Sequence, residues 1–63
     1  MARAKIKPII IECLREGPKT LDEIISYVSE KTGAEARIIK GILTKMVKRG
    51  ELRKTDDTYE LVG

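Results

Sequence analysis

The sequence has no histidine, tryptophan, phenylalanine, asparagine or glutamine, and Cys13 is its single cysteine. One cysteine excludes a disulfide within the chain, and the lack of histidine removes a common ligand of zinc. No apolar run reaches the roughly 18 residues of a membrane-spanning helix, and the first residues lack the layout of a secretory signal. The sequence therefore predicts a cytoplasmic protein without a metal or other cofactor and without a small-molecule substrate.

The same absences argue against catalysis. There is no histidine to act as a general base, and Cys13 falls on an apolar helical stripe that is predicted to be buried. No pair of carboxylates is placed by the pattern in an evident cleft. We therefore predict that the protein is not an enzyme.

Length and composition indicate one small domain. The 63 residues are predicted to form a single unit over 1–63, which would bury only about 60% of its unfolded surface. Charged residues make up 37% of the chain. Together with the lack of asparagine and glutamine, this resembles the composition of proteins from thermophiles.

Three stretches carry apolar residues at the spacing of one helix face, namely residues 5–16, residues 21–31 and about residues 35–49. Gly17 followed by Pro18 predicts the end of the first helix. Thr20 and Glu23 have the spacing of a capping box at the start of the second. Gly50 is expected to end the third.

The apolar spacing also predicts the core. The helical positions expected to face inward are Ile6, Ile9, Ile10, Cys13, Leu14, Leu21, Ile24, Ile25, Val28, Ala36, Ile39, Ile42, Leu43, Met46 and Val47. After Gly50 the period changes from 3.6 to 2, which predicts a two-stranded hairpin around the turn residues 55–58. Leu52, Tyr59 and Leu61 would share its inward face.

This order of elements resembles a known family. A helix, a capped helix, a basic helix reached by a short connection, and the run "KRGEL" at 48–52 are similar to the winged-helix DNA-binding domain, in particular to small stand-alone regulators of archaeal or thermophilic type. The resemblance implies an α+β fold in which a three-helix bundle with a helix-turn-helix precedes a two-stranded β-hairpin wing. Winged helices also serve as RNA-binding and protein-interaction modules. The alternative function is therefore an interaction module within a transcription, replication or repair assembly.

The charge of the chain is concentrated in one segment. Residues 37–54 hold seven Lys or Arg and one acid, whereas the whole chain has a net charge of +3. At about 100° per residue, the charged positions of the third helix lie opposite Ile39. One interpretation is an ordinary solvated face, although such faces usually mix charges of both signs. The other is a surface that binds a polyanion, and we favour it because residues 17–36 are acidic overall.

The resemblance implies that the third helix enters the major groove of double-stranded DNA. The predicted DNA-binding residues are Arg37, Lys40, Gly41, Thr44, Lys45, Lys48, Arg49, Arg53 and Lys54. Arg37 and Lys40 would contact base edges, Gly41 would allow close approach, and Thr44 would contact a thymine methyl or a phosphate. The other cations would contact phosphates. Acidic residues at the hairpin tip, Asp56 and Asp57, argue against deep insertion of the wing.

Two further surfaces are candidates for contacts outside this helix. Arg3, Lys5 and Lys7 form either a solubilising N-terminal end or a phosphate-contacting arm. Ile11 and Ile38 fall off the core stripes of their helices. A homodimer would match a two-fold DNA site, and Ile11 is the predicted dimer contact.

Overall fold

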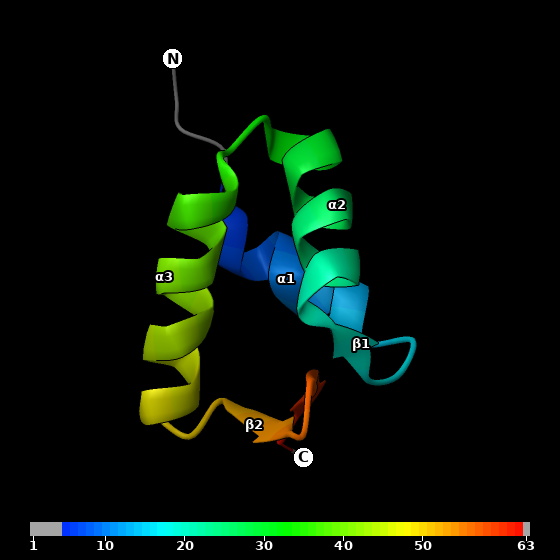
Figure 1. Ribbon diagram of the computed structural model, residues 1–63, viewed down its shortest axis with the longest axis vertical. Coiled ribbons are helices and arrows are strands. Elements are labelled where there is room, and N and C mark those ends of the chain that lie inside the picture. Colours follow the sequence, from blue (N-terminus) through cyan, green and yellow to red (C-terminus); the bar gives the residue numbers. More distant parts are fainter. Residues whose placement is uncertain (1–4, 63) are drawn as a thin grey trace.

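A computed structural model describes residues 5–62 (Figure 1). The elements are α1 (Ile6–Leu14), β1 (Lys19–Thr20), α2 (Leu21–Thr32), α3 (Ala36–Lys48), β2 (Leu52–Thr55) and β3 (Thr58–Leu61). Three helices and a small antiparallel sheet make an α+β domain whose layout is compatible with a winged helix. Within the described residues, no helix combines the length and apolar character needed to cross a bilayer.

The helices occupy the predicted segments with shifts of one or two residues at some ends. The capping box at the start of α2 is confirmed: the backbone N–H of Glu23 donates to Thr20 Oγ1 at 3.2 Å, and that of Thr20 donates to Glu23 Oε1 at 2.9 Å. Gly33 ends α2 in a left-handed conformation, with φ of 76°. Its N–H donates to the carbonyl of Ser29 at 2.7 Å, as in a helix C-cap.

The predicted two-stranded hairpin is present as β2 and β3, but the sheet also has a third strand that was not predicted, and its order is β1-β3-β2. β3 is central and pairs antiparallel with both neighbours, with Lys19 opposite Tyr59 and Thr20 opposite Thr58 on the β1 side. A strand of two residues is too short to show a period in the sequence. It forms because the chain passes alongside β3 before it enters α2.

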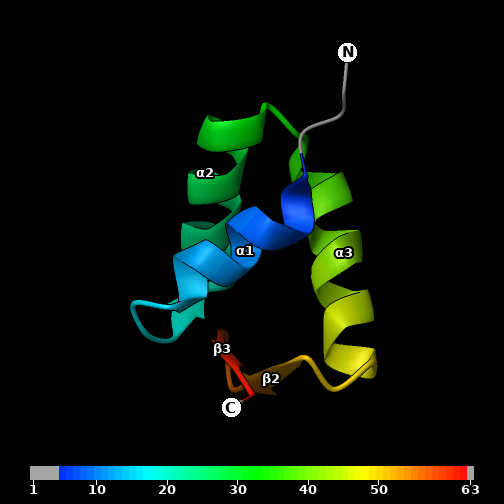
Figure 2. The same ribbon diagram turned by 180° about the vertical axis from the view of Figure 1, so that it is seen from behind.

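The sheet closes one end of the helical bundle. In Figure 1, α2 and α3 stand side by side and the hairpin lies across their lower end; from behind, α1 crosses both helices (Figure 2). The buried core combines all three helices and the hairpin, with Ile10, Cys13, Leu14, Ile24, Val28, Ile39, Leu43, Met46, Leu52 and Tyr59. Six of the other predicted inward positions, together with Leu61, are partly buried against this core.

Ala36 departs from the predicted core. It is exposed, although a helical wheel at about 100° per residue places it within about 60° of Ile39. Ala36 is the first residue of α3 and follows the N-cap Glu35. A helical wheel gives the direction of a side chain and does not show whether another element packs against the end of the helix.

Candidate nucleic-acid interface

The basic residues of α3 and its C-cap lie on the solvent side of the helix. Its buried residues, Ile39, Leu43 and Met46, recur at spacings of three and four and face the core. The side chains of Arg37, Lys40, Lys45, Lys48 and Arg49 are all exposed. The wheel phasing of this helix is therefore confirmed for every predicted cationic position on it.

These α3 cations are not neutralised by neighbouring acids. Three ion pairs form among residues 5–62: Lys7 with Glu51, Lys19 with Glu16, and Arg53 with Glu60. None of them involves an α3 residue or Arg49. The first turn of α3 also has no acidic residue. The result is a strip of positive charge that faces solvent without compensation from the described part of the chain.

Two small residues lie between the cations of this strip. Gly41 is exposed, and a Cβ added there would meet no atom within 4 Å, so internal packing does not require glycine. The hydroxyl of Thr44 donates to the carbonyl of Lys40 at 3.0 Å. Its proton is thus used within the helix, while its oxygen and methyl group remain available at the surface.

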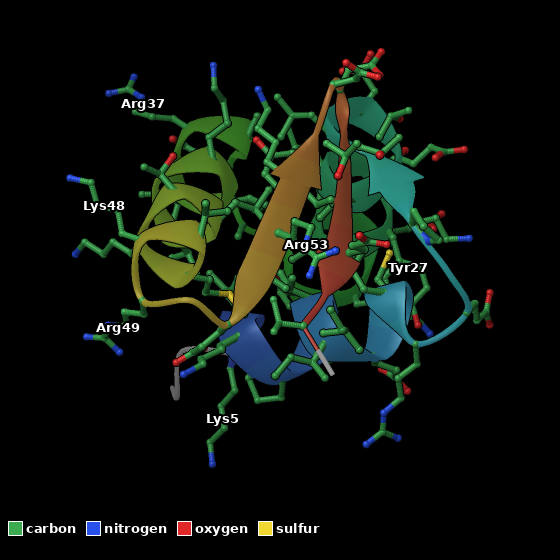
Figure 3. The ribbon with its side chains drawn as sticks, turned by 90° about the horizontal axis from the view of Figure 1, so that it is seen from below. Lys5, Tyr27, Arg37, Lys48, Arg49 and Arg53 are labelled. Carbon is green, nitrogen blue, oxygen red and sulfur yellow. The ribbon has the colours of Figure 1, made fainter. Side chains whose placement is uncertain are left out.

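The two hairpin cations lie on opposite faces of the sheet, although they are adjacent in sequence. Arg53 is opposite Glu60 in the β2–β3 register, and its Nη1 lies 3.6 Å from Glu60 Oε2. Figure 3 shows Arg53 in front of the sheet, while Arg37 and Lys48 extend from α3 at the side. Because side chains alternate along a strand, Lys54 is on the other face, which it shares with its partner Tyr59. The structure therefore brings Lys54 to the α3 side of the sheet and places Arg53 away from it.

A hollow of about 240 Å³ lies where α3 meets the hairpin. It is lined by Thr44, Val47 and Lys48 of α3 and by Lys54 and Tyr59 of the hairpin. Tyr59 is buried in the core, as predicted, but its place in the lining of this hollow was not predicted. The sequence signal for this was the residue type, because a tyrosine at the border of a core tends to keep its hydroxyl near solvent. In the structure, Tyr59 lies directly opposite Lys54 on the neighbouring strand.

The three residues predicted to form an N-terminal arm have different outcomes. Arg3 lies outside the described residues, and Lys5 is exposed immediately before α1. Lys7 belongs to α1, and its Nζ lies 2.9 Å from Glu51 Oε1.

The predicted dimer contact is less exposed than expected from its position on the wheel. Ile11 is partly buried and packs against the core, where it also lines a shallow hollow along α1. The large apolar side chains that are most exposed among residues 5–62 are Ile38 and Val62, each at 48%.

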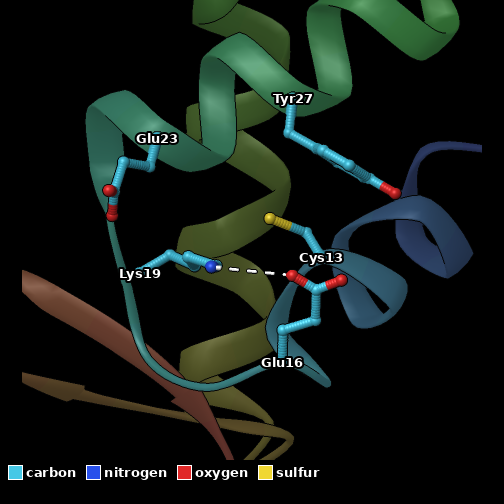
Figure 4. Close-up of a pocket in the computed structure, with 5 residues that line it drawn as sticks. All are labelled: Cys13, Glu16, Lys19, Glu23 and Tyr27. Atoms are coloured by element: carbon cyan, nitrogen blue, oxygen red, sulfur yellow. Dashed lines mark ion pairs between the residues drawn. The ribbon is translucent and has the colours of Figure 1, made fainter.

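A third hollow, the smallest of the three, surrounds the cysteine (Figure 4). It measures about 170 Å³ and is lined by Cys13, Glu16, Lys19, Glu23 and Tyr27. Lys19 Nζ lies 3.9 Å from Glu16 Oε1 across its mouth. Burial raises the pKa of the Cys13 thiol, which lowers its thiolate fraction and therefore its reactivity. In the described part of the chain, no three His, Cys, Asp or Glu side chains form a group that could hold a metal ion.

Comparison of the chain with protein-family models, curated proteins and solved structures finds no match.

Proposed function

We propose that the protein binds double-stranded DNA as a small transcriptional regulator of the winged-helix type, with α3 in the major groove. The observation that carries this proposal is the exposed strip of α3, where Arg37, Lys40, Lys45, Lys48 and Arg49 have no acidic partner among residues 5–62. An α-helix fits the major groove of B-DNA, and its flanks then lie beside the phosphates of both strands. The hairpin supports the helix from one side through Lys54.

The side chains available on α3 favour particular bases. Arginine and lysine recognise the O6 and N7 atoms of guanine, whereas adenine is usually read by asparagine or glutamine, which this chain lacks. Arg37, near the start of the helix, and Lys40, one turn later, are the proposed base-reading residues. We therefore expect any sequence preference to centre on guanine.

The proposal is tested by measuring affinity for a duplex of roughly 25 base pairs at several salt concentrations. The logarithm of the association constant should fall linearly with the logarithm of salt concentration, by about 0.9 for each phosphate contacted on B-DNA. Absence of binding at low salt would refute the proposal.

The role of α3 is tested separately with a charge-matched control. The double variant Arg37→Ala/Lys40→Ala should lose about 1–3 kcal/mol of binding for each base contact removed. The control, Arg15→Ala/Lys31→Ala, removes the same charge from exposed positions on the C-terminal side of α1 and in α2. Equal losses in the two double variants would show that net charge, rather than α3, determines binding.

The second candidate function is protein interaction, and the specific observation that favours it is Ile38, which is 48% exposed on α3. The first partner to test is a second copy of the chain. Sedimentation at increasing protein concentration would detect a homodimer. Ile38→Ala and Ile11→Ala then show which apolar side chain the dimer requires.

A further inference from the structure

We infer that the hollow between α3 and the hairpin binds one phosphate group, which Lys48 and Lys54 hold jointly. The inference rests on the proposed function where the phosphate belongs to a duplex. It also applies to a free phosphate group, because the recognising chemistry is the same.

Two lysine side chains line this hollow from different elements. Lys48 is in the last turn of α3, and Lys54 lies on the helix-facing side of β2, opposite Tyr59. No carboxylate lines the hollow, and neither lysine has an ion pair among residues 5–62. Like charges that share one site repel each other, and an anion bound between them removes that repulsion.

The other lining residues suit a phosphate oxygen. Tyr59 lines the hollow, and its phenolic hydroxyl makes no hydrogen bond to another residue in the range 5–62, so it is available as a donor. Thr44 has already donated its proton to Lys40, and Val47 supplies an apolar wall. The volume of about 240 Å³ is several times the roughly 30 Å³ that a water molecule occupies in the liquid. A hydrated phosphate group therefore fits.

This site changes how the hairpin meets DNA. Lys54 would contact the backbone at the face next to α3, whereas the tip carries Asp56 and Asp57, which phosphates repel. Arg53 faces away and is paired with Glu60, so it would take no part. The hairpin would then fix the position of α3 on the duplex through one phosphate and would not enter the minor groove.

The test compares the salt dependence of duplex binding for the wild type, Lys48→Ala, Lys54→Ala, the double variant and Arg53→Ala. Each lysine variant should bind more weakly, and its log–log slope should be shallower by about 0.9, the contribution of one phosphate. The double variant should lose the same single contribution, because both lysines serve one phosphate. Arg53→Ala, which removes the same charge one residue away, should keep the wild-type slope.

Two results would overturn the inference while the proposed function stands. A loss of about 1.8 in the slope of the double variant would mean that the lysines contact separate phosphates. A change in Arg53→Ala equal to that in Lys54→Ala would mean that position on the sheet is irrelevant.

Failure of the wild type to bind duplex would refute the proposed function alone, and a second measurement then decides about the hollow. Inorganic phosphate is titrated into ¹⁵N-labelled protein. Amide shifts confined to the hollow, at Thr44, Lys48, Lys54 and Tyr59, and absent in the double lysine variant, support a site for a free phosphate group. No such shifts, in a protein that also fails to bind duplex, would refute the site.

Discussion

Lys7 Nζ lies 2.9 Å from Glu51 Oε1, an ion pair that joins α1 to the turn before β2. The two residues are 44 positions apart in the sequence, and both side chains are more than one-third exposed. The ion pair engages Lys7, which is one of the residues predicted for a phosphate-contacting arm. Lys7 therefore has a structural role, and Lys5 is the described N-terminal residue that remains available for such an arm.

We expect Lys7→Ala to lower the free energy of unfolding by about 0.2–1 kcal/mol, the range of exposed ion pairs. The loss should shrink in high salt, which screens the pair in the wild type. Urea unfolding at low and at high salt measures both effects. Lys5→Ala is the matched control, and a Lys7→Ala loss no larger than that of Lys5→Ala would show that the pair does not stabilise the fold.

The hairpin turn gives a second matched comparison. Asp56 has a φ of 52°, in the left-handed region, and is the one non-glycine residue in the described range with a positive φ. Aspartate tolerates this conformation better than most residues because its short side chain can hydrogen-bond locally. Asp56→Ala should destabilise the domain by about 1 kcal/mol, whereas Asp57→Ala should change stability by less than about 0.5 kcal/mol. Thermal unfolding of both variants distinguishes the backbone effect from the charge, which each substitution removes equally.

Local chemistry explains which parts of the fold could be predicted. The capping box depends on Thr20 and Glu23 alone, and the phasing of α3 on residues within four turns, so both are readable from the sequence. β1 was missed because two residues have no period, and its existence depends on contact with β3 about 40 positions away. Ala36 was predicted to be in the core because a helical wheel gives the angle of a side chain and not what packs against the end of the helix.

The candidate site shows the same limit. Exposure of the α3 cations follows from helical phasing, and it was predicted. Arg53 and Lys54 were grouped as neighbouring cations, although strand alternation already required them to face opposite ways. Because Leu52 was predicted to face inward, the same alternation placed Lys54 on the inward side, and the structure adds that it lines a hollow with α3 there.

The buried thiol makes a prediction about pH. Burial raises the pKa of Cys13 above its ordinary value of 9.0, so the native thiol keeps its proton at a pH where the unfolded thiol has lost it. In that range the unfolded state binds fewer protons, and the free energy of unfolding falls as pH rises. We expect stability to fall more between pH 8 and pH 10 in the wild type than in Cys13→Ala, which has no thiol to titrate. Equal pH dependence in urea unfolding would contradict this.

Adjacent isoleucines on α3 test whether its two sides have the roles assigned to them. Ile39 is 0% exposed in the core, and Ile38 is 48% exposed beside the cationic strip. Ile39→Val removes one buried methylene and should cost about 0.5–1.5 kcal/mol, whereas Ile38→Val should stay within about 0.5 kcal/mol. In a domain of this size, 1 kcal/mol corresponds to about 4–8 °C in the midpoint of thermal unfolding, so the two variants are readily distinguished. Comparable losses would mean that Ile38 is also covered, either within the domain or by a second copy. Repeating the measurement at several protein concentrations separates these cases, because only a dimer makes the midpoint depend on concentration.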